Sequence, residues 1–328
     1  MRIAILDDYQ NAALASADWS RLPPGHDITV FTDHIPDRDQ AALRERLLPF
    51  DIVCIMRERT GLRIGLIEQL PNLKLVAITG MGSSVIDIGL AAKRGVLVCG
   101  CDGGGVSTEE HSFGLILALA RGIVPAHNSV QAGGWQVGLA RELRGATLGI
   151  VGLGRLGPTV TGFGNAFGMK VIAWSQNMTT EQASLAGAEL VTKDELFRQS
   201  DFVSILMRLS DRTRGLVGAR ELALMKPDAY LVNTSRGPIV DEAALLDALR
   251  NRRIAGAALD VFDEEPLPAD HPFRHTENLL VTPHMGYVSR ELYRLFHGGQ
   301  LENILAFLAG KPTNVLGEEN QVHRPPGR

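Results

Sequence analysis

The chain has 328 residues, enough for about two domains of ordinary size. Apolar residues make up 45% of it, which supports buried cores and excludes a disordered chain. The net charge of −4 provides no basic surface for nucleic acid, and no apolar run is long enough to span a membrane, so we expect neither a nucleic-acid partner, a signal peptide nor a membrane anchor.

The three cysteines, Cys54, Cys99 and Cys101, are an odd number without a disulfide framework. No neighbouring Cys or His cluster completes a metal site. We therefore expect buried thiols, no metal, and a reducing, cytoplasmic setting.

The first hundred residues alternate strand and helix patterns and predict a small parallel α/β unit. The predicted strands are residues 2–6, 28–31, 52–55, 76–79 and 97–98, and the predicted helices are 39–48, 64–69 and 86–94. Ligands bind beyond the carboxyl ends of such strands. The loop of Arg57 is therefore a candidate substrate contact, with a solvated loop as the alternative, and the backbone amides of residues 79–84 are a candidate nest for an anionic oxygen.

Residues 101–106 form the clearest break in composition, and we place the first crossing between domains there. Ser107 with Glu110 has the pattern of a capping box for a helix over residues 111–121. That helix is apolar on most faces, so we expect it to be buried within this chain or against another one. We interpret His111 as a helix-face histidine and residues 125–145 as an irregular arm.

A glycine-rich turn, Gly152-Leu153-Gly154-Arg155-Leu156-Gly157, follows a predicted strand over 146–151 and precedes a helix over 158–167 and a strand over 170–174. This context is typical of dinucleotide binding. The first glycine permits the tight turn, the second lets backbone approach the pyrophosphate, and the third lets helix and strand pack closely.

The acidic residue that usually follows the second strand is missing. A carboxylate there would bind the adenosine ribose hydroxyl of NAD and repel the 2′-phosphate of NADP. Ser175, followed by Gln176, can bond to either group. The sequence therefore predicts NAD or NADP and leaves the choice open.

The remaining chain continues the alternation. Further strands are predicted over 202–206, 230–233, 254–259 and 280–282, and helices over 180–185, 194–198, 219–225, 242–249 (capped by Asp241) and 291–309. The tail 321–328 is expected to be disordered, and we assign it no function.

Three ionisable side chains each follow a strand of the second domain: Arg236, Glu265 and His284. Such strand ends converge on one crevice. An arginine can hold a carboxylate bidentately, and an imidazole titrates near neutral pH, as a general acid and base requires. A carboxylate on its other nitrogen would fix the imidazole tautomer. Glu264 competes with Glu265, which we prefer because it directly precedes Pro266. Taken singly, the arginine fits a solvated turn, the acids fit an exposed loop, and the histidine after a proline fits a purely geometric role. All three together are much less expected by chance.

Four motifs together resemble the D-isomer-specific 2-hydroxyacid dehydrogenases: the glycine turn 152–157, residues 233–241, Asp260-Val261-Phe262 with Glu265-Pro266-Leu267, and residues 282–286. The resemblance implies an oxidoreductase that transfers a hydride between NAD(P)H and a small 2-keto acid or D-2-hydroxy acid. It also implies two Rossmann-like or flavodoxin-like parallel-sheet domains. The nucleotide domain, residues 104–287, would be inserted into a substrate domain of residues 1–103 and 288–328. A homodimer, formed through the apolar helix that follows residue 107, is implied as well.

The resemblance assigns catalysis to Arg236, Glu265 and His284, and contact with the nicotinamide amide to Asp260. Substrate contacts are expected at Arg57, Met81, Gly82, Arg236 and His284. The expected cofactor contacts are Gly152, Gly154, Arg155, Leu156, Gly157, Ser175, Gln176, Leu206, Thr234, Asp260 and Gly286.

Some residues depart from the family pattern. No arginine directly follows Ser175, Leu206 replaces a histidine that is common near the adenosine, and Gly82 replaces a larger polar residue. The pairing of Glu265 with His284 argues against formate dehydrogenases, which pair Gln with His. Two other functions stay open: a nucleotide-sensing protein similar to the family's corepressors, and a dehydrogenase of another oxyanion such as phosphite.

Overall fold

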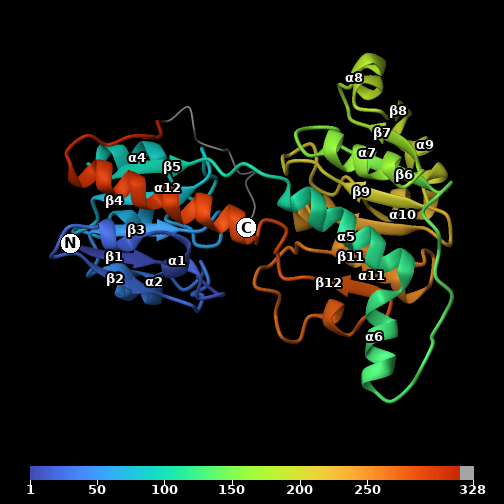
Figure 1. Ribbon diagram of the computed structural model, residues 1–328, viewed down its shortest axis with the longest axis horizontal. Coiled ribbons are helices and arrows are strands. Elements are labelled where there is room, and N and C mark those ends of the chain that lie inside the picture. Colours follow the sequence, from blue (N-terminus) through green and yellow to red (C-terminus); the bar gives the residue numbers. More distant parts are fainter. Residues whose placement is uncertain (318–328) are drawn as a thin grey trace. The chain divides into compact units, whose positions relative to one another are not determined.

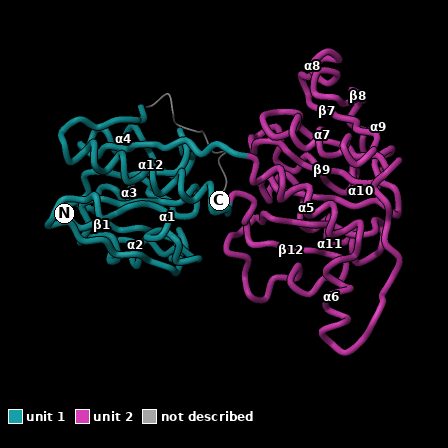
Figure 2. The backbone as a smooth tube through the Cα atoms, in the orientation of Figure 1, with its two compact units in different colours: residues 1–105, 288–328 teal, residues 106–287 magenta. Residues whose placement is uncertain are grey.

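The computed structural model describes residues 1–317, the Ile64 side chain excepted, so the predicted tail 321–328 lies outside the described residues. The chain forms two compact units (Figure 2). Unit 1 contains residues 1–105 and the segment from Val288 onward, and unit 2 is Val106–Tyr287. The first crossing thus follows residue 105, inside the composition break at residues 101–106 and two residues beyond the expected domain boundary after residue 103.

Unit 1 is built on five parallel strands in the order β2-β1-β3-β4-β5. They are β1 Arg2–Ile5, β2 Asp27–Val30, β3 Ile52–Ile55, β4 Leu75–Thr79 and β5 Leu97–Cys101. This is the strand order of flavodoxin-like sheets. The central strands β3 and β4 are buried on both faces, which is why they form continuous rather than alternating apolar runs in the sequence.

The helices of unit 1 cover both faces of this sheet (Figure 1). They are α1 Ala13–Ser16, α2 Gln40–Leu47, α3 Ile64–Ile67, α4 Ile88–Lys93 and α12 Arg290–Leu308, with a 3-10 turn η1 at Trp19–Arg21. The C-terminal helix α12 returns to pack against β4 and β5. Its Leu301 and Ile304 join Ile3 and Ile5 in one buried cluster, so this unit needs both ends of the described chain.

Unit 2 contains seven parallel strands in the order β12-β11-β10-β9-β6-β7-β8. They are β6 Thr147–Val151, β7 Lys170–Trp174, β8 Glu189–Leu190, β9 Phe202–Ile205, β10 Tyr230–Asn233, β11 Gly256–Leu259 and β12 Leu279–Val281. The chain winds outward from β6 to β8 and then in the opposite direction from β9 to β12. Ligands of such sheets bind where the winding reverses, beyond the carboxyl ends of the strands.

The helices of unit 2 are α5 Ser107–Arg121, α6 Ile123–Gln131, α7 Gly157–Ala166, α8 Thr180–Leu185, α9 Lys193–Gln199, α10 Ala219–Leu224 and α11 Glu242–Arg250, with 3-10 turns η2 Gly237–Ile239 and η3 Pro272–His275. Apolar clusters cover each face of the sheet. The predicted fold class, two parallel α/β domains, is therefore confirmed.

Two local predictions were wrong. The helix expected from residue 111 begins at Ser107, its N-cap is Val106 without a side-chain bond, and the Ser107 hydroxyl donates to Gly286 O instead of forming a capping box. The supposed arm also contains helix α6. Gly122, with φ +60°, ends α5 and starts α6, and Pro125 lies in the first turn, where a missing N–H costs nothing.

Within residues 1–317, no single helix has the length and apolar composition needed to cross a membrane. Only α5 and α6 taken together meet that test, and they are bent by 62°.

Candidate active site

The glycine turn joins β6 to α7, and its three glycines have different surroundings. Gly152 has φ +98°, and a side chain there would overlap Met207. A Cβ on Gly154 would meet nothing within 4 Å, so the turn presents an open backbone face. A Cβ on Gly157 would lie 3.2 Å from Gly152 O and 2.9 Å from a Leu153 methyl. A tight turn at the first glycine, an open backbone at the second and close packing at the third are the three properties of a turn that binds a pyrophosphate.

The residues around this turn fit a dinucleotide. The first turn of α7 has no side-chain cap, so its N–H groups, except at Pro158, which has none, remain as donors for phosphate oxygens. Arg155 is exposed beside this opening, and Ser175 and Gln176 follow the end of β7 directly. Leu206 is buried directly after β9. No carboxylate follows β7 at Ser175 to repel a 2′-phosphate.

His284 and Glu265 meet beyond the carboxyl ends of β11 and β12. His284 Nδ1 lies 2.5 Å from Glu265 Oε2, and Glu265 Oε1 accepts the Phe262 N–H at 2.8 Å. Both side chains remain about one-third exposed, at 29% and 33%. Because Nδ1 faces the carboxylate, Nε2 is the ring nitrogen that can meet a substrate oxygen. Of the two competing acids, Glu265 is the one at the imidazole.

The backbone of His284 is unusual for a residue with a side chain. Its φ is +50°, and its N–H donates to Thr282 O at 3.0 Å across Pro283. Such a left-handed conformation costs about 1–3 kcal/mol and persists only where the surroundings impose it. The Tyr287 ring also packs edge-on against the imidazole, with 5.6 Å between ring centroids.

Arg236 lies in a tight turn directly after β10. The Asn233 side chain donates to Arg236 O at 3.0 Å and accepts the Ser235 N–H at 3.0 Å, so the turn is bonded across its base. The guanidinium donates to Ser235 O at 2.6 Å. A Cβ on the next residue, Gly237, would overlap the Phe262 carbonyl and lie 2.5 Å from the Asp263 nitrogen. Gly237 therefore lets the Arg236 turn and the Glu265 loop come into backbone contact.

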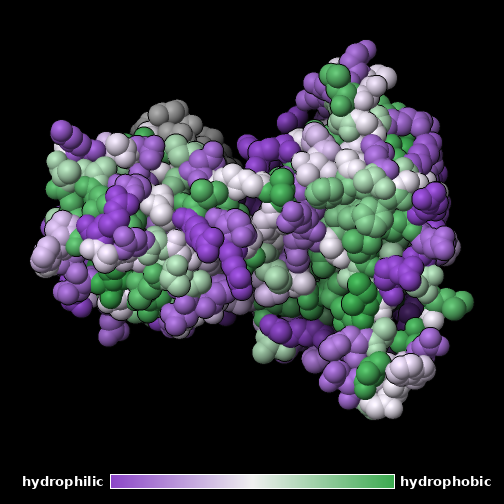
Figure 3. All heavy atoms as spheres, viewed as in Figure 1, coloured by the Kyte–Doolittle hydropathy of each residue, from purple (hydrophilic) through white to green (hydrophobic). Residues whose placement is uncertain are grey.

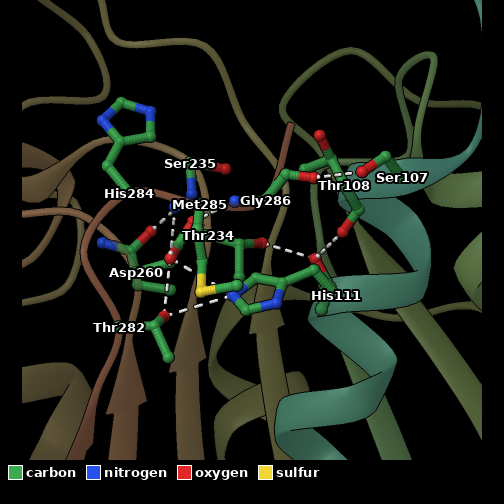
Figure 4. Close-up of polar contacts among 12 residues, drawn as sticks. Ser107, Thr108, His111, Thr234, Ser235, Asp260, Thr282, His284, Met285 and Gly286 are labelled. Carbon is green, nitrogen blue, oxygen red and sulfur yellow. Dashed lines mark hydrogen bonds and ion pairs between the residues drawn. The ribbon is translucent and has the colours of Figure 1, made fainter. Parts of the chain in front are cut away.

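Asp260 is only 1% exposed, and both of its carboxylate oxygens accept hydrogen bonds from this chain (Figure 4). Its Oδ1 accepts the Thr282 hydroxyl at 2.5 Å and the Met285 N–H at 2.9 Å, while Oδ2 accepts the Gly286 N–H at 2.8 Å. Burial opposes ionisation, but hydrogen bonds from His111 and Thr282 outweigh it and lower the pKa of Asp260. The carboxylate is therefore held ionised against the turn that follows His284.

Helix α5 contributes polar groups to this region, which the sequence interpretation missed. His111 Nε2 lies 3.1 Å from Thr282 Oγ1 and 3.2 Å from Asp260 Oδ1. One helical turn earlier, Ser107 donates to Gly286 O at 2.8 Å. The signal available was the i, i+4 spacing of Ser107 and His111, which places both side chains on one face of the helix.

The expected substrate contacts Arg57, Met81 and Gly82 belong to unit 1. Arg57 follows β3, has φ +54°, and donates its N–H to Thr79 Oγ1 at 2.6 Å. Met81 and Gly82 follow β4, and the Met81 side chain is exposed. These residues thus share the carboxyl edge of the unit 1 sheet.

Comparison with known proteins gives consistent matches. Residues 113–286 match the family model for the D-isomer specific 2-hydroxyacid dehydrogenase, NAD binding domain. A glyoxylate reductase of Aeropyrum pernix is 42% identical over 275 residues, 80% of this chain and 82% of that one. A glycerate dehydrogenase of Methylorubrum extorquens is 36% identical, covering 83% and 87%. A crystal structure of a putative D-3-phosphoglycerate dehydrogenase from Ralstonia solanacearum aligns with a TM-score of 0.92 at 36% identity, over 98% of each chain.

Proposed function

Because the chain belongs to the D-isomer-specific 2-hydroxyacid dehydrogenase family, we propose that it reduces a small 2-keto acid to the D-2-hydroxy acid through His284, Glu265 and Arg236. The predicted family, the predicted NAD(P)-dependent oxidoreductase activity on 2-hydroxy or 2-keto acids, and its cofactor class are confirmed. The observation that carries the proposed roles is the 2.5 Å contact between His284 and Glu265 in the unit that also holds the glycine turn.

The chemistry divides among the three side chains. The nicotinamide cofactor, when bound, supplies the hydride that reaches the keto carbon. Arg236 holds the substrate carboxylate by a charge-assisted fork and so orients the neighbouring carbonyl. His284 donates the Nε2 proton to the keto oxygen, which becomes the hydroxyl of the product. Glu265 faces Nδ1 and accepts its hydrogen bond, which fixes the orientation and tautomer of the ring so that Nε2 faces the substrate. In the oxidation direction the same imidazole accepts the hydroxyl proton.

The test is a panel of glyoxylate, hydroxypyruvate, pyruvate and phenylpyruvate with NADH and NADPH, followed by nicotinamide absorbance. We expect turnover on at least one keto acid. Cofactor binding without turnover on any of them, by folded protein, would instead favour the nucleotide-sensing function. Phosphite with NAD tests the remaining oxyanion alternative.

Cofactor choice is proposed to depend on Ser175. A carboxylate there would bind the ribose hydroxyls and repel a 2′-phosphate. We expect Ser175→Asp to raise the ratio of kcat/KM for NADH over NADPH by about 30-fold, mainly through a higher KM for NADPH. Ser175→Asn, which adds a similar volume without charge, is the matched control. An unchanged ratio in the Asp variant would show that Ser175 lies away from the ribose.

We propose that the two units bind different ligands. Residues 104–287 would bind the dinucleotide, and residues 1–103 with 288–328 would bind the keto acid through Arg57, Met81 and Gly82. Support comes from their positions beyond the carboxyl ends of β3 and β4. The KM for the keto acid in Arg57→Ala tests this assignment, since an unaltered KM excludes Arg57 from the substrate site.

A homodimer through the nucleotide unit is proposed from exposed apolar surface. Helix α6 buries none of its residues, and Ile123, Val130 and Trp135 are 53%, 50% and 75% exposed. On the visible face of unit 2, apolar side chains also gather over α5 and α7 (Figure 3). The face of α5 toward the sheet is buried within unit 2. Such apolar surface is typical of an interface between subunits.

We expect light scattering to give twice the 35.5 kDa chain mass for the wild type and the monomer mass for the double variant Ile123→Asp, Val130→Asp. Leu185→Asp, at a side chain that is 90% exposed on α8, is the control and should remain a dimer. A monomeric wild type at micromolar concentration contradicts the proposal.

A cytoplasmic location is proposed from the thiols. Cys54, Cys99 and Cys101 are buried and unpaired, and burial raises the pKa of Cys99 and of Cys101 to about 11, so neither is poised to oxidise. Fractionation of the source cells tests the location, and recovery outside the cytoplasm would refute it.

A further inference from the structure

Helix α5 contacts the turns that carry the proposed catalytic residues. Ser107 donates to Gly286 O, two residues after His284. His111 bonds to Thr282, two residues before His284, and to Asp260. One residue further along α5, Ser112 Oγ lies 2.6 Å from Thr234 Oγ1, two residues before Arg236.

The direction of the hydrogen bonds at His111 follows from the donors available. Thr282 has one hydroxyl proton, and it is given to Asp260 Oδ1 at 2.5 Å. Thr282 Oγ1 must therefore accept from His111, so Nε2 carries a proton that is shared between Thr282 and the nearby Asp260 Oδ1. His111 thus acts as a donor that binds two acceptors from consecutive strand ends.

Asp260, which His111 holds in place, in turn holds the turn that carries His284. Its two oxygens accept the N–H groups of Met285 and Gly286, the residues that directly follow the left-handed His284. A Cβ on Gly286 would lie 3.2 Å from Asp260 Oδ2 and 3.6 Å from the His111 ring, so turn and helix are already in close contact. In Figure 4 the His284 ring points away from this network, so His111 does not reach it directly.

We propose that His111 is a positioning residue for the proton transfer: its Nε2–H fixes Asp260 and Thr282, which hold the left-handed turn that presents the His284 imidazole. The proposal rests on the proposed function, because it takes His284 as the acid. Losing the donor would leave the buried Asp260 short of one hydrogen bond and free the turn to relax toward ordinary backbone angles. Misplacement of a catalytic group by about 1 Å lowers the rate of the chemical step by up to about 100-fold.

The experiment compares His111→Leu with His111→Gln, whose amide nitrogen has about the reach of Nε2. We expect His111→Leu to lower kcat by about 30-fold while the KM for the keto acid changes less than threefold, and His111→Gln to recover at least a third of the wild-type kcat. His275→Leu, which removes an exposed imidazole from η3, is the matched control and should keep the wild-type kcat.

The second readout does not depend on turnover. The His284 ring resonance, assigned through its loss in His284→Ala, is expected to shift and broaden in His111→Leu and to return toward its wild-type position in His111→Gln. An unmoved His284 resonance overturns the proposal, as does a His111→Leu variant with kcat within twofold of wild type, or equal losses in the Leu and Gln variants. A wild type without turnover on any keto acid overturns the proposed function instead, and the resonance then decides the role of His111.

Discussion

Replacing His284 by alanine is expected to lower kcat on the best keto acid by about 1,000-fold, because general acid catalysis by a positioned side chain contributes about 10²–10⁴-fold. The imidazole lies against a carboxylate beyond the end of β12, with Nδ1 on Glu265 and Nε2 available for the keto oxygen. The binding of NADH or NADPH, measured by fluorescence titration, should change by less than threefold, because the glycine turn is unaltered.

Two further measurements make that result specific to His284. His275→Ala removes an imidazole from an exposed 3-10 turn and should leave kcat unchanged. The melting temperature of His284→Ala should stay near that of the wild type, since the side chain removed is partly exposed and alanine keeps the Cβ and therefore the same backbone strain. A His284→Ala enzyme with more than a tenth of the wild-type kcat would remove the imidazole from the proton transfer.

Gly237→Ala is expected to lower kcat/KM by about 100-fold, because displacement of a binding group by about 1 Å has effects of that size. The alanine methyl group would overlap the Phe262 carbonyl, and both neighbours are backbone that cannot move aside as a flexible side chain would. The turn holding Arg236 and the loop holding Glu265 must then separate. We also expect the free energy of unfolding to fall by about 2 kcal/mol, the usual cost of overpacking a buried contact.

The matched control is Gly162→Ala on α7. A Cβ there meets nothing within 4 Å, and alanine is the better helix former, so stability should rise by about 0.5–1 kcal/mol with activity retained. Chemical denaturation and keto-acid kinetics on both variants provide the comparison. If Gly237→Ala keeps kcat/KM within threefold of wild type, the close approach at Phe262 is not needed for the site.

Local patterns predicted most elements of this chain. The strand over 52–55, the strand over 170–174 and the helix over 180–185 have the predicted bounds, because continuous apolar runs, glycine stops and a Thr-initiated cap are local signals. Elements with weak local signals were not predicted. The two-residue strand β8 has too few residues for a period, and Gly122 joined two helices where a single stop was expected.

The residues of the site likewise divide into those that local sequence patterns predicted and those that they did not. Chain order and residue type were enough to predict the glycine turn and the three strand ends that carry Arg236, Glu265 and His284. The three-dimensional structure was needed to show that Glu265 rather than Glu264 contacts His284, 19 positions further along the chain. It was also needed to show that His111 bonds to Asp260 instead of lying without a role on a helix face. These contacts depend on strand order, register and helix packing, which arise from interactions between distant segments, and no local pattern contains that information.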